Sequence, residues 1–189
     1  MPTRFTTLRS LALLLMFALF FTACDSTEPD DDGAGEEEII SDVTVTLTNA
    51  ADNSTVSAEA IFDEAGVVQS VDPLDLTPGA TYSGTIELLN RFEDEDITEE
   101  IDEERDEHQF FYEVDGGVSG AVTVTITDTD SNGYPVGLEF TVTVADDASG
   151  TGELRVVLGH YDERPKQASE TLDDTPERDI DFNYPVEIQ

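Results

Sequence analysis

The sequence is dominated by segments in which apolar and polar residues alternate, several of them Val-Thr repeats. The clearest are residues 43–48, 122–127, 140–144, 154–158 and 182–188. A period of two sends successive side chains to opposite faces of a β-strand. Threonine suits the solvent face because it is β-branched and polar. Strands with one buried and one wet face are typical of antiparallel sheets.

Three further strands are expected at residues 58–63, 82–89 and 109–114, and Gly, Asn and Asp occur in the turns. About seven or eight strands with such turns predict an all-β fold, an antiparallel β-sandwich of the immunoglobulin-like type. The inner faces carry enough Val, Ile, Leu and Phe for a hydrophobic core.

One acidic segment departs from this alternation. Eleven of the fifteen residues from 93 to 107 are acidic. Ile97 and Ile101 are one helical turn apart, and Asp96 precedes them as a candidate N-cap. The pattern predicts one short acidic helix near residues 96–107, which the acidic residues of its last turn destabilise.

The N-terminal end has the features of an export signal. Arg4 and Arg9 lie before an apolar run at residues 11–21, which is shorter than the roughly 20 residues that span a bilayer. The tetrapeptide FTAC resembles a bacterial lipobox and contains the only cysteine, Cys24. We expect cleavage before Cys24 and attachment to the membrane through a lipid on its thiol. The alternative is an ordinary secretory signal with an unrelated cysteine.

Composition defines a second boundary. Residues 25–38 contain eight acidic residues and no large apolar residue, so they cannot form a core. We therefore expect a lipoprotein signal peptide at 1–23, a lipidated cysteine with a disordered acidic tether at 24–38, and a β-sandwich domain at 39–189. A flexible tether of this length reaches roughly 20 Å.

The charge of the chain excludes some partners. Cleavage before Cys24 leaves six basic residues against 44 acidic ones, a net charge of −38. Such a charge excludes nucleic-acid binding through a basic surface. Acidic excess with a single lysine, Lys166, is similar to the composition of proteins from salt-adapted microbes. A single cysteine also excludes a disulfide within the chain.

The twelve residues 128–139 match the calcium-loop pattern of EF-hand proteins. Calcium prefers six to eight oxygen ligands. The ligands here would be the side chains of Asp128, Asp130 and Asn132, the carbonyl of Tyr134, and Glu139. Strands rather than helices flank the segment, so the alternative is an Asn-Gly hairpin turn without an ion. Calcium binding without Glu139 is a third interpretation.

His108 and His160 are the only histidines, and each lies at the edge of an expected strand. Glu104 lies one helical turn before His108. Imidazole and carboxylate groups together form a ligand set for zinc or copper. If the two strand ends meet, these three residues would form a metal site. The alternative is two independent histidines.

No nucleophile elbow, glycine-rich phosphate loop or CxxC pair is present in the sequence. Paired carboxylates occur throughout the chain and therefore do not distinguish an active site. We expect no enzyme, and we assign no catalytic residue and no organic cofactor.

Four stretches resemble a group of short bacterial lipoproteins labelled "type 1 periplasmic binding fold superfamily". They are residues 81–90 (TYSGTIELLN), 106–112 (DEHQFFY), 128–138 (DTDSNGYPVGL) and 153–160 (ELRVVLGH). The resemblance implies a periplasmic or surface location and a role beside outer-membrane uptake receptors. The label implies a doubly wound α/β fold, which the strand pattern contradicts. The histidines match the pattern of this group.

Two functions remain open from the sequence. The first is a lipid-anchored cell-envelope binding module for a divalent cation or small ligand, accessory to outer-membrane uptake. The second is a structural or interaction lipoprotein, a spacer or adhesin-like domain with no small ligand. For both we expect the outer membrane rather than the inner membrane.

Overall fold

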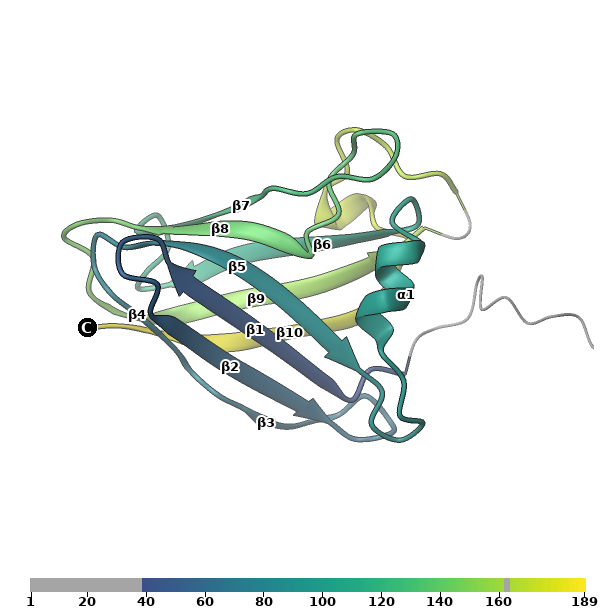
Figure 1. Ribbon diagram of the computed structural model, residues 1–189, viewed down its shortest axis with the longest axis horizontal. Coiled ribbons are helices and arrows are strands. Elements are labelled where there is room, and N and C mark those ends of the chain that lie inside the picture. The colour runs from purple at the N-terminus through teal and green to yellow at the C-terminus, as the bar shows by residue number, and fades with distance from the viewer. Residues whose placement is uncertain (1–38, 162–163) are drawn as a thin grey trace, which may run out of the picture. The chain divides into compact units, whose positions relative to one another are not determined.

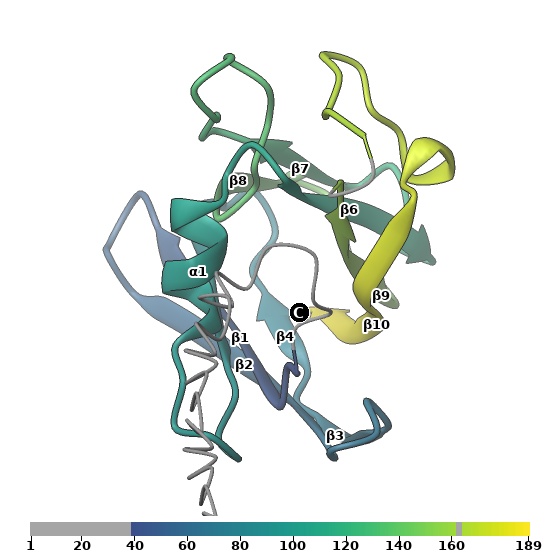
Figure 2. The same cartoon turned by 90° about the vertical axis from the view of Figure 1, so that its right-hand side faces the viewer.

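The computed structural model describes residues 39–161 and 164–189. These residues form two β-sheets with one hydrophobic core, which confirms the predicted antiparallel β-sandwich (Figures 1 and 2). The doubly wound α/β architecture implied by the resemblance is not present in these residues. The predicted signal peptide at 1–23 and the tether at 24–38, with Cys24, lie outside the described residues.

The larger sheet has six strands in the order β3-β2-β1-β5-β8-β7, each antiparallel to its neighbours. Every second residue of β1 faces the core, and Val43, Val45 and Leu47 are fully buried. The Val-Thr alternation therefore orients the strand as expected. The strands are β1 (Asp42–Asn49), β2 (Thr55–Phe62), β3 (Val68–Val71), β5 (Thr81–Leu89), β7 (Val122–Ile126) and β8 (Glu139–Val144).

The smaller sheet has four strands in the order β4-β10-β9-β6. Strand β9 pairs antiparallel with β10 and β6, whereas β4 runs parallel to the end of β10. The last five residues of β9 are all buried, so the alternation stops before this strand ends. The strands are β4 (Leu74–Leu76), β6 (His108–Gly116), β9 (Gly150–His160) and β10 (Glu177–Ile188).

The described residues contain ten strands, more than the about seven or eight expected from the pattern. The two extra edge strands are short. Strand β3 has four residues that are mostly exposed, and β4 has three. Neither is long enough to show a clear alternation, because a pattern of period two needs several residues to be recognised.

The acidic segment forms helix α1 (Ile97–Glu103), which is shorter than the expected span of 96–107. Asp96 caps it by accepting hydrogen bonds from the N–H groups of Thr98 and Glu99. Both isoleucines of the helix are buried. The helix is short because its last turn has no basic residue to balance the helix dipole. Among the described residues, no helix is long and apolar enough to span a membrane.

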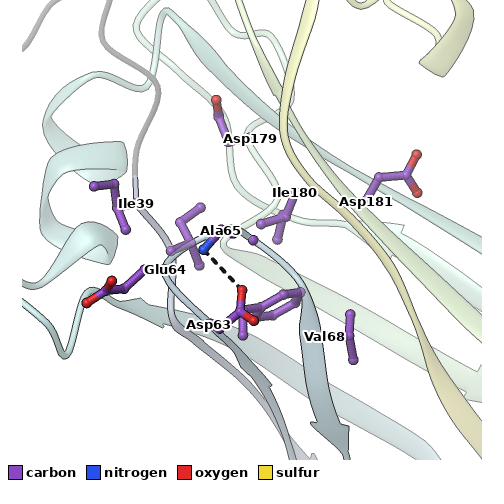
Figure 3. Close-up of a pocket in the computed structure, with 11 residues that line it drawn as sticks. Ile39, Asp63, Glu64, Ala65, Val68, Asp179, Ile180 and Asp181 are labelled. Atoms are coloured by element: carbon purple, nitrogen blue, oxygen red, sulfur yellow. Dashed lines mark hydrogen bonds between the residues drawn. The ribbon is translucent and has the colours of Figure 1, made fainter.

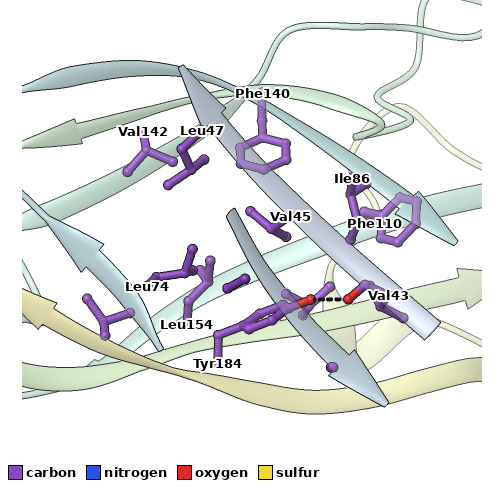
Figure 4. Close-up of a cluster of buried hydrophobic side chains, with 14 of the residues drawn as sticks. Val43, Val45, Leu47, Leu74, Ile86, Phe110, Phe140, Val142, Leu154 and Tyr184 are labelled. Atoms are coloured by element: carbon purple, nitrogen blue, oxygen red, sulfur yellow. Dashed lines mark hydrogen bonds between the residues drawn. The ribbon is translucent and has the colours of Figure 1, made fainter. Parts of the chain in front are cut away.

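Aromatic and aliphatic side chains from both sheets fill the core (Figure 4). The Tyr184 hydroxyl donates a hydrogen bond of 2.7 Å to the Val43 carbonyl and so joins β10 to β1. The ring of Tyr112 packs against Phe140 with centroids 4.5 Å apart. Burying each such large side chain stabilises the fold by roughly 1.5–3 kcal/mol.

One end of the sandwich holds the residues that concern function. Helix α1, the beginnings of β6 and β10, and the end of β9 lie there (Figure 1). The described chain also begins at this end, where the Ser41 N–H donates to the Leu89 carbonyl. Because β6, β9 and β10 begin or end here, their register determines which of their side chains lie close together at this end.

Candidate metal centre

Two buried histidines face each other at this end of the smaller sheet. His108 is the first residue of β6 and His160 is the last residue of β9, and the register pairs them directly. Their exposed fractions are 0% and 1%. Their rings stack with centroids 4.5 Å apart. The structure thus brings together the two histidines that the sequence nominates as metal ligands.

Asp179 on β10 places a carboxylate beside this pair. The register of β10 against β9 shifts between Arg178 and Ile180, which makes Asp179 an extra residue in a β-bulge. A bulge redirects a side chain, and the Asp179 side chain is only 2% exposed. Regular alternation would have placed Asp179 on the solvent face, opposite to Ile180. The sequence pattern therefore gave no signal for this residue.

The ligand atoms of His108, His160 and Asp179 all lie within 4.8 Å of one another. His160 Nδ1 is 3.7 Å from Asp179 Oδ1. This separation is longer than a hydrogen bond and near the roughly 3.4 Å between two ligands of a tetrahedral zinc ion. In the described part of the chain, no other three His, Cys, Asp or Glu side chains come this close together.

A backbone carbonyl orients the first imidazole. His108 Nδ1 lies 3.3 Å from the Glu104 carbonyl oxygen. A carbonyl can only accept, so Nδ1 is the donor in this contact, and Nε2 is the ring nitrogen left for a metal ion. Metal-bound histidines usually donate their second nitrogen in this way, which fixes the ring. Glu104 thus contributes its backbone, and Asp179 rather than the Glu104 carboxylate completes the cluster.

In the candidate calcium loop, the first acidic side chain forms hydrogen bonds with other residues of the protein. Asp128 Oδ1 accepts a hydrogen bond of 2.8 Å from the Gly137 N–H, and Oδ2 accepts one of 3.3 Å from Arg105. Glu139 begins β8, is exposed, and pairs with Thr85 of β5. The structure does not bring Glu139 together with the other proposed calcium ligands.

The centre of the same loop is a tight turn. Asp130 Oδ1 accepts hydrogen bonds of 2.8 Å from the N–H groups of Asn132 and Tyr134. The Tyr134 carbonyl, which the calcium pattern assigns to the ion, accepts a hydrogen bond of 2.8 Å from the Asp130 N–H. These bonds match the hairpin-turn interpretation of the sequence.

A lysine ammonium group lies at the second carboxylate of this loop. Lys166 Nζ is 3.0 Å from Asp130 Oδ2, and the two side chains are 1% and 0% exposed. Nζ also donates hydrogen bonds of 2.6, 2.8 and 3.1 Å to the carbonyl oxygens of Arg105, His108 and Pro135. One carboxylate and three carbonyls therefore surround a cation that belongs to the protein itself.

Burial and charge act in opposite directions on this pair. Burial is the largest influence on Lys166 and lowers its pKa, while Asp130 acts to raise it. Burial also acts to raise the pKa of Asp130, but hydrogen bonds from the Tyr134 N–H and from Lys166 outweigh it. The pKa of Asp130 therefore lies below its ordinary value, and the carboxylate is ionised at neutral pH.

Comparisons with known proteins give little similarity. No protein-family model matches the sequence, and no curated protein is similar to it. Among solved structures, the crystal structure of the S-layer protein SbsC domains 4 and 5 is similar, with 16% sequence identity and a TM-score of 0.27. The similarity covers 77% of this chain and 64% of that chain, less than two thirds of its length. A TM-score this low supports no inference about function.

Proposed function

We propose that this protein is a lipid-anchored cell-envelope module that binds a transition-metal ion through His108, His160 and Asp179. The observation that carries the proposal is the convergence of three metal-ligating side chains from β6, β9 and β10 at a buried position. A bound ion would also join the ends of three neighbouring strands.

The ligand chemistry favours zinc or copper over calcium. Calcium requires six to eight oxygen ligands, whereas this cluster offers two imidazoles and one carboxylate. Zinc accepts nitrogen and oxygen ligands in tetrahedral sites, and imidazole also suits copper. Three protein ligands leave a fourth tetrahedral position for water or a small ligand.

Zinc titration of the untagged mature protein tests this proposal. We expect one zinc ion to bind in isothermal titration calorimetry at high salt, where non-specific attraction to the acidic surface is screened. His108→Ala and Asp179→Asn should each weaken binding at least about 100-fold, because even groups that only orient metal ligands contribute 10–100-fold. Zinc at a hundredfold excess over Kd should raise the free energy of unfolding by about 2.7 kcal/mol.

Glu104→Gln is the matched control for this experiment. It removes the carboxylate that the sequence nominates and leaves the backbone carbonyl that orients His108. Zinc affinity should therefore stay at the wild-type value. Absence of saturable zinc and copper binding to the wild-type protein would contradict the proposal. The His160–Asp179 contact would then be an ion pair, and a structural or interaction lipoprotein would be the better explanation.

Membrane attachment is a separate part of the proposal, based on the lipobox-like FTAC sequence at Cys24. Cys24→Ser removes the thiol that would carry the lipid, so we expect uncleaved precursor and no acylated protein. Mass spectrometry of the membrane fraction measures both. The wild-type anchor should be stable, since each buried methylene contributes about 0.8 kcal/mol. Normal cleavage and membrane partitioning of Cys24→Ser would contradict the proposed lipid anchor. The proposed location beside an outer-membrane uptake receptor would then lose its basis as well.

A further inference from the structure

One side of β10 lacks a strand partner over much of its length. Strand β4 pairs only with the residues from Val186 to Ile188. Within residues 39–161 and 164–189, no strand pairs with this side of β10 before Val186. Pro185, which has no N–H, and the bulge at Asp179 bound the open stretch. The outer backbone groups of residues 180–184 thus form an unpaired sheet edge.

A cavity of about 340 Å³ lies beside this edge. The turn between β2 and β3 lines one side, and β10 and the first described residues line the rest (Figure 3). Its apolar lining includes Ile39, Phe62, Val68 and Ile180. Ile39 and Val68 are 49% and 43% exposed, which is high for large apolar residues. An aliphatic or aromatic side chain of a partner would cover them.

The charges around the cavity favour a basic partner. The residues that line it include four carboxylates and no lysine or arginine. Asp63 is used within its own turn, where it accepts backbone hydrogen bonds. Asp181 pairs with Arg155 and Arg178. The exposed Glu64 and the net charge of the mature chain leave this region acidic.

Charge also disfavours two other occupants of the cavity. The first is the segment of the chain directly before Ile39. It consists of three consecutive glutamates, 36–38, which offer neither an apolar side chain nor a positive charge. A second copy of the chain has the same large negative charge, and the two copies would repel each other. A different protein with basic residues fits the site better.

We propose that residues 180–184 of β10 dock an extended segment of a partner protein in which apolar and basic residues alternate. The segment adds a strand to the smaller sheet, as in other complexes formed by β-strand addition. One apolar side chain enters the cavity between Phe62 and Ile180, and the basic side chains on the opposite face meet the acidic surface. About five residues pair, a length of roughly 17 Å. The inference does not depend on the metal.

Two synthetic heptapeptides of the same composition test this docking site. One alternates lysine and valine, and the other groups its three valines together. In high salt we expect the alternating peptide to bind at least about tenfold more tightly in fluorescence anisotropy, because only it directs its valines to one face. Hydrogen exchange should slow at residues 180–184 and stay unchanged at β7, an edge strand of the larger sheet. Equal affinity of the two peptides, or no protection of β10, overturns the proposal.

A matched pair of substitutions locates the contact. Val68 lines the cavity, whereas its neighbour Val67 is 55% exposed and does not line it. Val68→Lys should weaken the alternating peptide at least about tenfold, because it blocks the apolar pocket. Val67→Lys adds the same charge nearby and should bind like the wild type. Equal effects of the two would show attraction by charge alone and overturn the proposal. Zinc affinity should not change in either variant.

Discussion

Lys166→Met is expected to lower the free energy of unfolding by about 3–5 kcal/mol, because it leaves the buried Asp130 carboxylate without its counterion. The ammonium group also donates hydrogen bonds to the carbonyl oxygens of Arg105, His108 and Pro135. These three carbonyls would lose a charged donor. Urea denaturation measures the loss as a lower midpoint at constant slope.

Arg178→Met is the matched control for this prediction. Arg178 also pairs with an aspartate, Asp181, but both side chains are 34% exposed. Exposed ion pairs contribute about 0–1 kcal/mol, so this variant should lose little stability. Adding Asp130→Asn to Lys166→Met should restore part of the loss, because it removes the unpaired buried charge. If Lys166→Met and Arg178→Met had equal small effects, the buried pair would not contribute to stability as described.

The sandwich could be predicted because its strands depend on local alternation. In β1, Val43, Val45 and Leu47 alternate with threonines, and the structure buries the first set. The helix was also foreseeable, since Asp96 caps it and its isoleucines are one turn apart. Strands β3 and β4 were not, because they are held by pairing with β2 and β10 rather than by a pattern of their own.

The site could be predicted only in part, because it depends on pairing between distant segments. Both histidines lie at expected strand ends, and the register of β6 with β9 brings them together. Asp179 joins them through a bulge in β10, which has no sequence signature here. Lys166 reaches Asp130 from a connection between strands. Its identity as the only lysine was visible in the sequence, but its partner was not.

His108 links the Lys166 ammonium group to the candidate metal cluster. Its carbonyl accepts a hydrogen bond from Lys166, and its imidazole belongs to the candidate metal cluster. The Lys166–Asp130 pair therefore helps to fix the first residue of β6, on which the direction of the imidazole depends. A site held by backbone contacts of this kind keeps its geometry better than one on a free loop.

Gly152→Ala is expected to lower the free energy of unfolding by roughly 3 kcal/mol, near the upper end for overpacked cores. Gly152 lies in β9, an inner strand of the smaller sheet, opposite Gly116 of β6 and Val186 of β10. A methyl group at this position would overlap the Asp115 carbonyl oxygen and the side chain of Val118. Val118 is fully buried, and a paired backbone carbonyl cannot move without disturbing the strands.

Gly159→Ala on the same strand is the control that separates backbone overlap from side-chain overlap. The methyl group would there overlap a methyl group of Thr175, which lies outside the strands, and its three nearest contacts are all side-chain atoms. We therefore expect a loss of about 1 kcal/mol, at the lower end for added volume. Urea denaturation of both variants at constant ionic strength decides the comparison. Equal losses in the two variants would mean that overlap with the β6 backbone does not restrict the size of the side chain at position 152.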